Sequence, residues 1–179
     1  LHRMLDDEKI EPGKITVLLR YKNIMPEIVE AFNREFPDTK IVSDEAYRLS
    51  SSLTLQLVIS AMRYIATPED RVNTANLVML YNKVMLEKEM LFGEDLSFEA
   101  IAEMLPAEFR NELKHLQSLP VYELIEQLLV LLGMSEEKDE EAYIYTFLDY
   151  ATQYLNGKTS DLNGFLEAWD ETIADKSIP

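Results

Sequence analysis

The sequence predicts a mainly α-helical fold, a multi-helix domain with a small strand–helix–strand corner at its N-terminal end. Two observations support this prediction. After Ser50 the apolar residues recur at intervals of three and four, which is the spacing of one helix face. Before Ser50 lie two short runs of aliphatic and β-branched residues, which are typical of strands. The chain has no repeat of fixed period, so a helical solenoid is not predicted.

The N-terminal corner is predicted from residues 14–43. Residues 14–20 read KITVLLR, and these side chains predict a short, largely buried strand. Asn23 can cap the helix that follows, and residues 40–43 are predicted as a second strand. The apolar face of the helix would consist of Ile28, Val29, Ala31 and Phe32. Two strands joined by a helix in this way are expected to pair in parallel.

The first long helices are predicted at residues 53–66 and 69–88. Three serines at 50–52 stand where helix-capping oxygens are needed. One apolar stripe of the first helix consists of Leu53, Leu57, Val58, Ala61, Met62 and Ile65. The sequence Thr-Pro-Glu-Asp at 67–70 predicts the start of the second helix. It offers a capping threonine, a proline in the first turn and two acids near the positive end of the helix dipole.

Further helices are predicted along the rest of the chain. They cover residues 96–105 with Ser97 as a cap, 106–116, 121–132 with Gly133 as the stop, 140–155, and a last helix capped by Asp161. The hydrophobic residues make up 47% of the chain, which is enough for a substantial core. We expect that core to include Leu57, Val58, Met62, Leu128, Phe147 and Trp169.

Composition limits the partners and the compartment. The net charge is −16, with 33 acidic against 17 basic residues, so the chain is not expected to wrap DNA by itself. No apolar run approaches the roughly 18 residues that a membrane span needs, and no signal-peptide pattern is present. The lack of cysteine excludes disulfides and thiolate metal sites and fits a reducing, cytoplasmic location.

Motifs that carry chemistry are missing from the sequence. There is no GxxxxGK[ST], GxGxxG or GxSxG pattern, and thiol nucleophiles are excluded. Glu112 and His115 have the spacing of half a carboxylate metal motif, but the second pair that a di-iron bundle needs is absent, since His2 is the only other histidine. The acidic run at 135–141 is interpreted as a solvated helix start rather than a surface for a basic partner. We therefore assign no catalytic, cofactor-binding or metal-binding residue to this chain.

A family resemblance rests on short stretches taken in order. They are ITVLLRYKN at 15–23, IVSDEA at 41–46, the serines at 50–52, LVISAMRY at 57–64 and PEDR at 68–71. This ordered set resembles the UvrD/Rep-like superfamily 1 DNA helicases, and most closely the RecB/AddA, exodeoxyribonuclease V beta-like branch. The resemblance is weaker after Glu87.

The resemblance implies a domain organisation. Residues 1–50 would be a lead-in and the edge of the second motor lobe, and residues 51–176 the inserted helical accessory domain, often called 2B. Residues 177–179 would lead towards the rest of the motor. The chain begins with leucine and ends in an extended-looking tail, so we expect both ends to continue in a longer polypeptide. The ATP-binding motifs would lie upstream, and an HKSKGLEF-like motif would follow shortly after Pro179.

The resemblance also implies a function without chemistry in this chain. The accessory domain would regulate the motor and contact DNA or a partner subunit. The parent would be an ATP-dependent DNA helicase or helicase–nuclease of recombination and repair, using ATP and magnesium. One departure bears on duplex contact, because the Gly-Ile-Gly-type turn of several relatives is missing and Gly93 is the only glycine between Ile41 and Pro120.

One basic turn is the candidate nucleic-acid site. Arg20 matches the arginine that ends a strand in these helicases, whereas Tyr21 and Lys22 stand where threonine or serine and asparagine are common. A base here could neutralise a phosphate, and Tyr21 could stack on a nucleobase. The alternative is that Arg20 only pairs with an acid at the strand end.

A rival hypothesis from another class remains open. The charge and the amphipathic helices also suit a free-standing acidic helical adaptor that binds a protein partner. Gene context separates the two hypotheses, since a reading frame with a phosphate-binding loop upstream and a helicase motif downstream supports the first.

Overall fold

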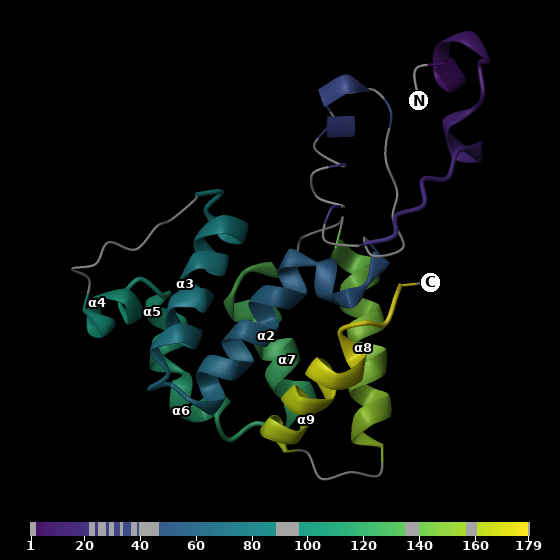
Figure 1. The fold of residues 1–179 in the computed structure, drawn as a ribbon. Helices are drawn as coiled ribbons and strands as arrows, with labels where there is room; N and C mark the ends of the chain where they lie inside the picture. Colours follow the sequence, from purple (N-terminus) through teal and green to yellow (C-terminus); the bar gives the residue numbers. More distant parts are fainter. Residues whose placement is uncertain are drawn as a thin grey trace. The chain divides into compact units, whose positions relative to one another are not determined.

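The computed structural model describes residues 3–21, 24, 28, 31–32, 34–36, 39, 47–88, 97–134, 140–156 and 161–178. These residues belong to two compact units, Leu1–Ser43 and Asp44–Pro179, and each unit is described by itself. The prediction of a mainly helical fold is confirmed (Figure 1). Within the described ranges no helix is both long and apolar enough to cross a membrane.

The N-terminal unit corrects the prediction of a buried strand at 14–20. A 3-10 turn, η2 (Pro12–Lys14), is followed by irregular backbone, and the side chains of Val17 and Leu18 are 48% and 90% exposed. A strand needs a neighbouring edge for its backbone hydrogen bonds, and no described residue supplies one. The second predicted strand, 40–43, lies outside the described residues.

The rest of the N-terminal unit is helical where it is described. A short π-type turn, η1 (Arg3–Asp7), opens the unit. The described positions between 28 and 35 are helical, in agreement with the predicted helix. Phe32 and Phe36 lie one turn apart there, with ring centroids at 5.2 Å.

The second unit is built around helix α2 (Leu53–Ala66). In Figure 1 α2 lies between α3 and the group formed by α7, α8 and α9, and it contacts each of these helices. Ser52 caps α2 as predicted, since its Oγ accepts from the Leu55 N–H at 3.0 Å. Most of α2 is buried, including Leu57, Val58 and Met62, because neighbours cover more than one of its faces.

Helix α3 (Arg71–Met85) starts later than predicted. Asp70, and not Thr67, is its N-cap, because the Asp70 carboxylate accepts from the N–H groups of Val72 and Asn73 at 2.8 and 3.1 Å. A carboxylate that satisfies two orphan N–H groups is a better cap than a threonine on a turn. Residues 67–70 form the turn between α2 and α3.

Short helices follow along α3. Ser97 caps α4 (Phe98–Ala102) as predicted, accepting from the Ala100 N–H at 3.2 Å. The helix predicted at 106–116 is divided at Glu112 into α5 (Ala107–Asn111) and α6 (Leu113–Leu116). Phe109 of α5 and Leu116 of α6 are both fully buried.

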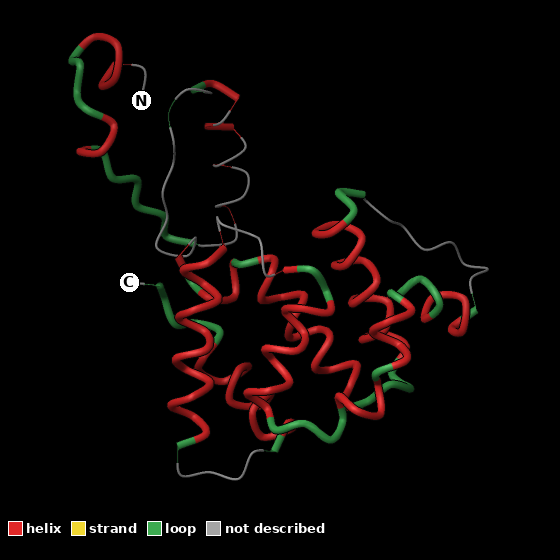
Figure 2. Tube along the Cα trace, turned by 180° about the vertical axis from the view of Figure 1, so that it is seen from behind, coloured by secondary structure: helices red, strands yellow, loops and turns green. Residues whose placement is uncertain are grey.

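The last helices close the core. Helix α7 (Val121–Leu131) ends before Gly133, whose φ of +74° suits glycine. Helix α8 (Glu141–Leu155) precedes α9 (Leu162–Ala168), which Asp161 caps as predicted and which continues as the π-type turn η8 (Trp169–Ile173). Figure 2 shows these helices from behind, with helix as the only regular structure in the described part of the chain.

An aromatic cluster joins α8 to the C-terminal helices. The Phe147 ring lies edge-on to Trp169 at 5.4 Å and to Phe165 at 6.0 Å, and Tyr154 meets Phe165 at 5.5 Å. The core prediction is confirmed, since all six residues are buried: Leu57, Val58, Met62, Leu128, Phe147 and Trp169.

Candidate functional site

The two ends of the helical unit lie side by side and form what we call the neck, residues 47–51 and 174–178. Backbone hydrogen bonds run from Leu49 N to Lys176 O at 2.8 Å and from Ser50 N to Ala174 O at 3.0 Å. A third runs from Ile178 N to Tyr47 O at 2.9 Å. Between them Arg48 and Ser177 form an antiparallel bridge. The chain therefore enters and leaves this unit at one place.

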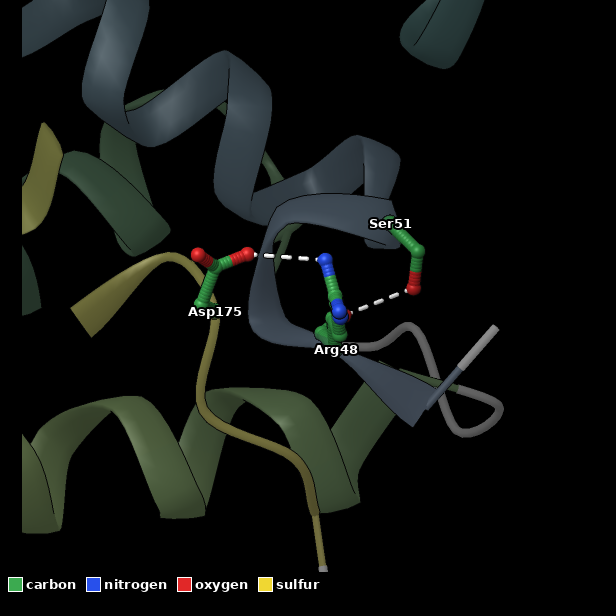
Figure 3. Close-up of polar contacts among 3 residues, drawn as sticks. All are labelled: Arg48, Ser51 and Asp175. Carbon is green, nitrogen blue, oxygen red and sulfur yellow. Dashed lines mark hydrogen bonds and ion pairs between the residues drawn. The ribbon is translucent and has the colours of Figure 1, made fainter. Parts of the chain in front are cut away.

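An ion pair reinforces the neck. The Arg48 guanidinium donates to the Asp175 carboxylate at 2.9 Å, as Figure 3 shows. On the other side Ser51 Oγ donates to the Arg48 carbonyl at 2.6 Å, which holds the backbone turn that starts the 3-10 turn η5 (Leu49–Ser51). Arg48 itself is extended, with φ −72° and ψ 147°. Its side chain can therefore reach across to the outgoing segment.

The helical unit holds both sides of the neck through buried residues. On the incoming side Leu49 is fully buried, and the Ser52 hydroxyl donates to the Glu140 carboxylate at the start of α8. On the outgoing side Ile173 is 5% exposed. Arg63 of α2 donates to Asp170 of η8 at 2.6 Å, so a second ion pair fastens the C-terminal turn. The neck is thus fixed to the core at Leu49 and Ile173.

An open cleft of about 220 Å³ lies between α2, α3 and η8. Ser60 and Asn76 are joined in its wall, with Asn76 Nδ2 donating to Ser60 Oγ at 3.2 Å, and Gln56 Nε2 donates to the Ser50 carbonyl at 2.8 Å. The lining residues are Ser50, Gln56, Ile59, Ser60, Arg63, Asn76, Leu80 and Trp169. Amide, hydroxyl and guanidinium groups can bind a polar group, but this lining holds no base that could activate a serine.

The basic turn in the N-terminal unit is exposed at the two positions that are described. The Arg20 guanidinium lies 5.5 Å from the centroid of the Tyr21 ring, and Tyr21 is 61% exposed. Such a stacked pair offers a charge and an aromatic face to solvent. Among the described residues no acid pairs with Arg20. Lys22 lies outside the described residues, so the turn is described only in part.

The Glu112 and His115 side chains are exposed around the division between α5 and α6. The described part of the chain contains no group of three metal-ligating side chains.

Burial raises the pKa of Tyr64, and the nearby Arg110 partly offsets this rise. Tyr64 packs against Phe109 with ring centroids at 5.9 Å, so its raised pKa reflects the core environment.

The neck was not predicted from the sequence. Its ion pair joins residues 127 positions apart, and no local pattern marks such a contact. The nearest signal is an arginine before the serines at 50–52 and an aspartate in the tail after the last helix.

Comparisons of this chain with protein-family models, with curated proteins and with solved structures give no match.

Proposed function

We propose that residues 51–176 are a helical accessory domain inserted in an ATP-dependent DNA helicase or helicase–nuclease subunit. The domain does no chemistry itself; it regulates the motor and contacts DNA or a partner subunit. The neck is the observation that carries this proposal. An insertion leaves its host at one point and returns to it at the next, so its two ends must be adjacent. Here they are hydrogen-bonded to each other through Leu49 and Lys176.

The N-terminal unit supports the same proposal. Residues 15–19 have no regular secondary structure, are rich in β-branched and aliphatic side chains, and are exposed at Val17 and Leu18. A segment of this composition is suited to a pleated, half-buried surface and gains its hydrogen bonds by joining a sheet edge. We propose that it completes a sheet of the second motor lobe in the same polypeptide. Arg20 would then end that strand, as the family resemblance implies.

The partners of this proposal follow from the charge. The chain carries −16, so its DNA contacts must be local, and the basic turn at Arg20 and Tyr21 is the part that would face the single strand. ATP and magnesium would be bound by the upstream motor. The remaining domains of the polypeptide would be the chief partner, with a partner nuclease or helicase subunit beyond them.

The test is a deletion in the full-length polypeptide. Residues 50–173 are replaced by a short glycine–serine turn that keeps Leu49 and Ala174 close, and ATP hydrolysis and strand separation are measured with and without DNA. We expect DNA-stimulated hydrolysis to persist within about tenfold, while the rate or extent of unwinding changes. A core variant, Leu57→Ala, serves as control, since it destabilises the accessory domain while leaving it attached.

Two results would refute the proposal. One is a reading frame without a phosphate-binding loop upstream of residue 1, which would favour the acidic adaptor. The other is complete loss of ATP hydrolysis in a deletion protein that is folded, which would place residues 50–173 within the motor itself.

A further inference from the structure

The incoming side of the neck is anchored in the core by Leu49, whereas the outgoing side, residues 174–178, has only Ala174 and Ile178 partly buried against the core. Asp175 is 72% exposed and Arg48 is 34% exposed, and Lys176 and Ser177 are also exposed. The backbone hydrogen bonds of Leu49, Ser50 and Ile178 are its other fastenings. Segments with few buried apolar contacts and exposed hydrogen bonds open more easily than a protein's core. The neck therefore has the features of a locally opening segment.

The extent of an opening is set by the buried residues on either side. Leu49 is fully buried, and Ile173 and Trp169 are each 5% exposed. Breaking the hydrogen bonds of residues 174–178 removes none of these three side chains from the core and frees only the partly buried Ala174 and Ile178. Opening can thus stop at Ile173, with α2, α8 and α9 unchanged.

We propose that the neck opens and closes separately from the helical core, and that the Arg48–Asp175 ion pair stabilises its closed state. We call this arrangement the latch. Among the described residues this is the one ion pair that joins the two segments of the neck. Because both side chains are exposed, salt weakens their attraction. Opening is consequently favoured by high ionic strength and by any group that competes for Arg48 or Asp175.

Opening of the neck would lengthen the connection between the inserted domain and its motor, and this step rests on the proposed function. A closed neck holds the incoming and outgoing segments together at Arg48 and Ser177. An open neck releases residues 174–178, which when extended add roughly 17 Å to the outgoing connection. The inserted domain would then be tied to its motor by a longer tether on one side. The latch would set how far the accessory domain can move from the motor.

The test is amide hydrogen exchange of the whole chain, followed residue by residue by NMR at low salt. The reporters are the amides of Leu49, Ser50 and Ile178, and the reference is a set of core amides in α2. We expect the neck amides to exchange much faster than the core amides in the unaltered chain. Arg48→Ala and Asp175→Ala should each raise neck exchange about two- to fivefold, which is the range expected for an exposed ion pair.

The matched control is Arg63→Ala. It breaks the Arg63–Asp170 pair. The side chain of Arg63 has the same 34% exposure as that of Arg48, but both partners of this pair lie outside the neck. This variant should leave neck exchange within about 1.5-fold of the unaltered chain. The reversed pair, Arg48→Asp with Asp175→Arg, should restore at least half of the protection that either single reversal removes.

Two outcomes would overturn the latch. If the neck amides exchange at the rate of the α2 amides, opening is not separate from unfolding of the core. If Arg48→Ala raises the exchange rate of the neck amides no more than Arg63→Ala does, the Arg48–Asp175 ion pair does not stabilise the closed neck. These measurements do not involve ATP or DNA, so their failure leaves the accessory-domain proposal intact, and refutation of that proposal leaves the latch intact.

Discussion

Truncation of Phe147 tests whether the aromatic cluster holds α8 against the C-terminal helices. Phe147 is fully buried, and its ring contacts Trp169 and Phe165 at 5.4 and 6.0 Å. Phe→Ala changes in a core cost about 3–5 kcal/mol through lost burial and the cavity left behind. Each aromatic pair contributes about 0.5–1.5 kcal/mol beyond its buried area. We therefore expect Phe147→Ala to lower the free energy of unfolding by about 4–5 kcal/mol.

The assay is urea unfolding, followed by far-ultraviolet circular dichroism and by the fluorescence of Trp169, the only tryptophan. With a slope of about 2 kcal/mol per M, the midpoint should fall by roughly 2 M. The control is Tyr145→Ala, two residues away on α8 and 65% exposed, which should cost less than about 0.5 kcal/mol. Equal losses in the two variants would refute the assignment of the buried face of α8.

Other predictions concern a helix cap, a buried tyrosine and the basic turn. Asp70→Ala should lower the free energy of unfolding by about 1 kcal/mol, because two N–H groups of α3 lose their acceptor, whereas Glu69→Ala should change it little; thermal unfolding measures both. Burial raises the pKa of Tyr64 above 10.0, so the folded chain holds this proton more tightly than the unfolded chain does. Its contribution to stability is complete below pH 10 and is lost as the pH rises further, and Tyr64→Phe should remove that part of the alkaline dependence in a urea titration. The chain alone should bind duplex DNA weakly at physiological salt, by fluorescence anisotropy, and tight, steeply salt-dependent binding would contradict the charge argument. If the proposed helicase function is right, Arg20→Ala in the parent polypeptide should lower DNA-stimulated ATP turnover more than it lowers the melting temperature, and unchanged turnover would reduce Arg20 to a structural residue.

Helix α2 shows what the sequence could predict. Its bounds and its serine cap follow from the spacing of apolar residues and from residues 50–52, and the structure has both. The predicted apolar stripe is buried except for Leu53, which is 38% exposed at the start of the helix. Such features are local, so they leave a local pattern. The same holds for the cap at Asp161 and for the stop at Gly133, where a positive φ favours glycine.

The errors have physical causes too. Thr67 was predicted as the cap of the second helix, but which side chain satisfies the orphan N–H groups depends on the geometry of the turn, and Asp70 does so in the structure. The segment at 14–20 has strand propensity, but strand formation requires a partner edge that composition does not reveal. Contacts between residues 127 positions apart, such as Arg48 with Asp175, depend on the whole fold. The neck could therefore be found only in the structure.

The bridge between Arg48 and Ser177 also changes the chain entropy of any polypeptide that continues from both sides of it. When this unit is folded, it acts as a short loop for the chain on either side, because the two ends of the unit are held side by side. When it unfolds, the same connection becomes a flexible loop of well over a hundred residues. Each doubling of loop length costs about 0.6 kcal/mol, so growth from about 8 to 128 residues costs a flanking domain roughly 2.4 kcal/mol. A domain that continued from both sides of the bridge and the helices of this unit would thus stabilise one another through the chain connection, with no side-chain contact needed between them.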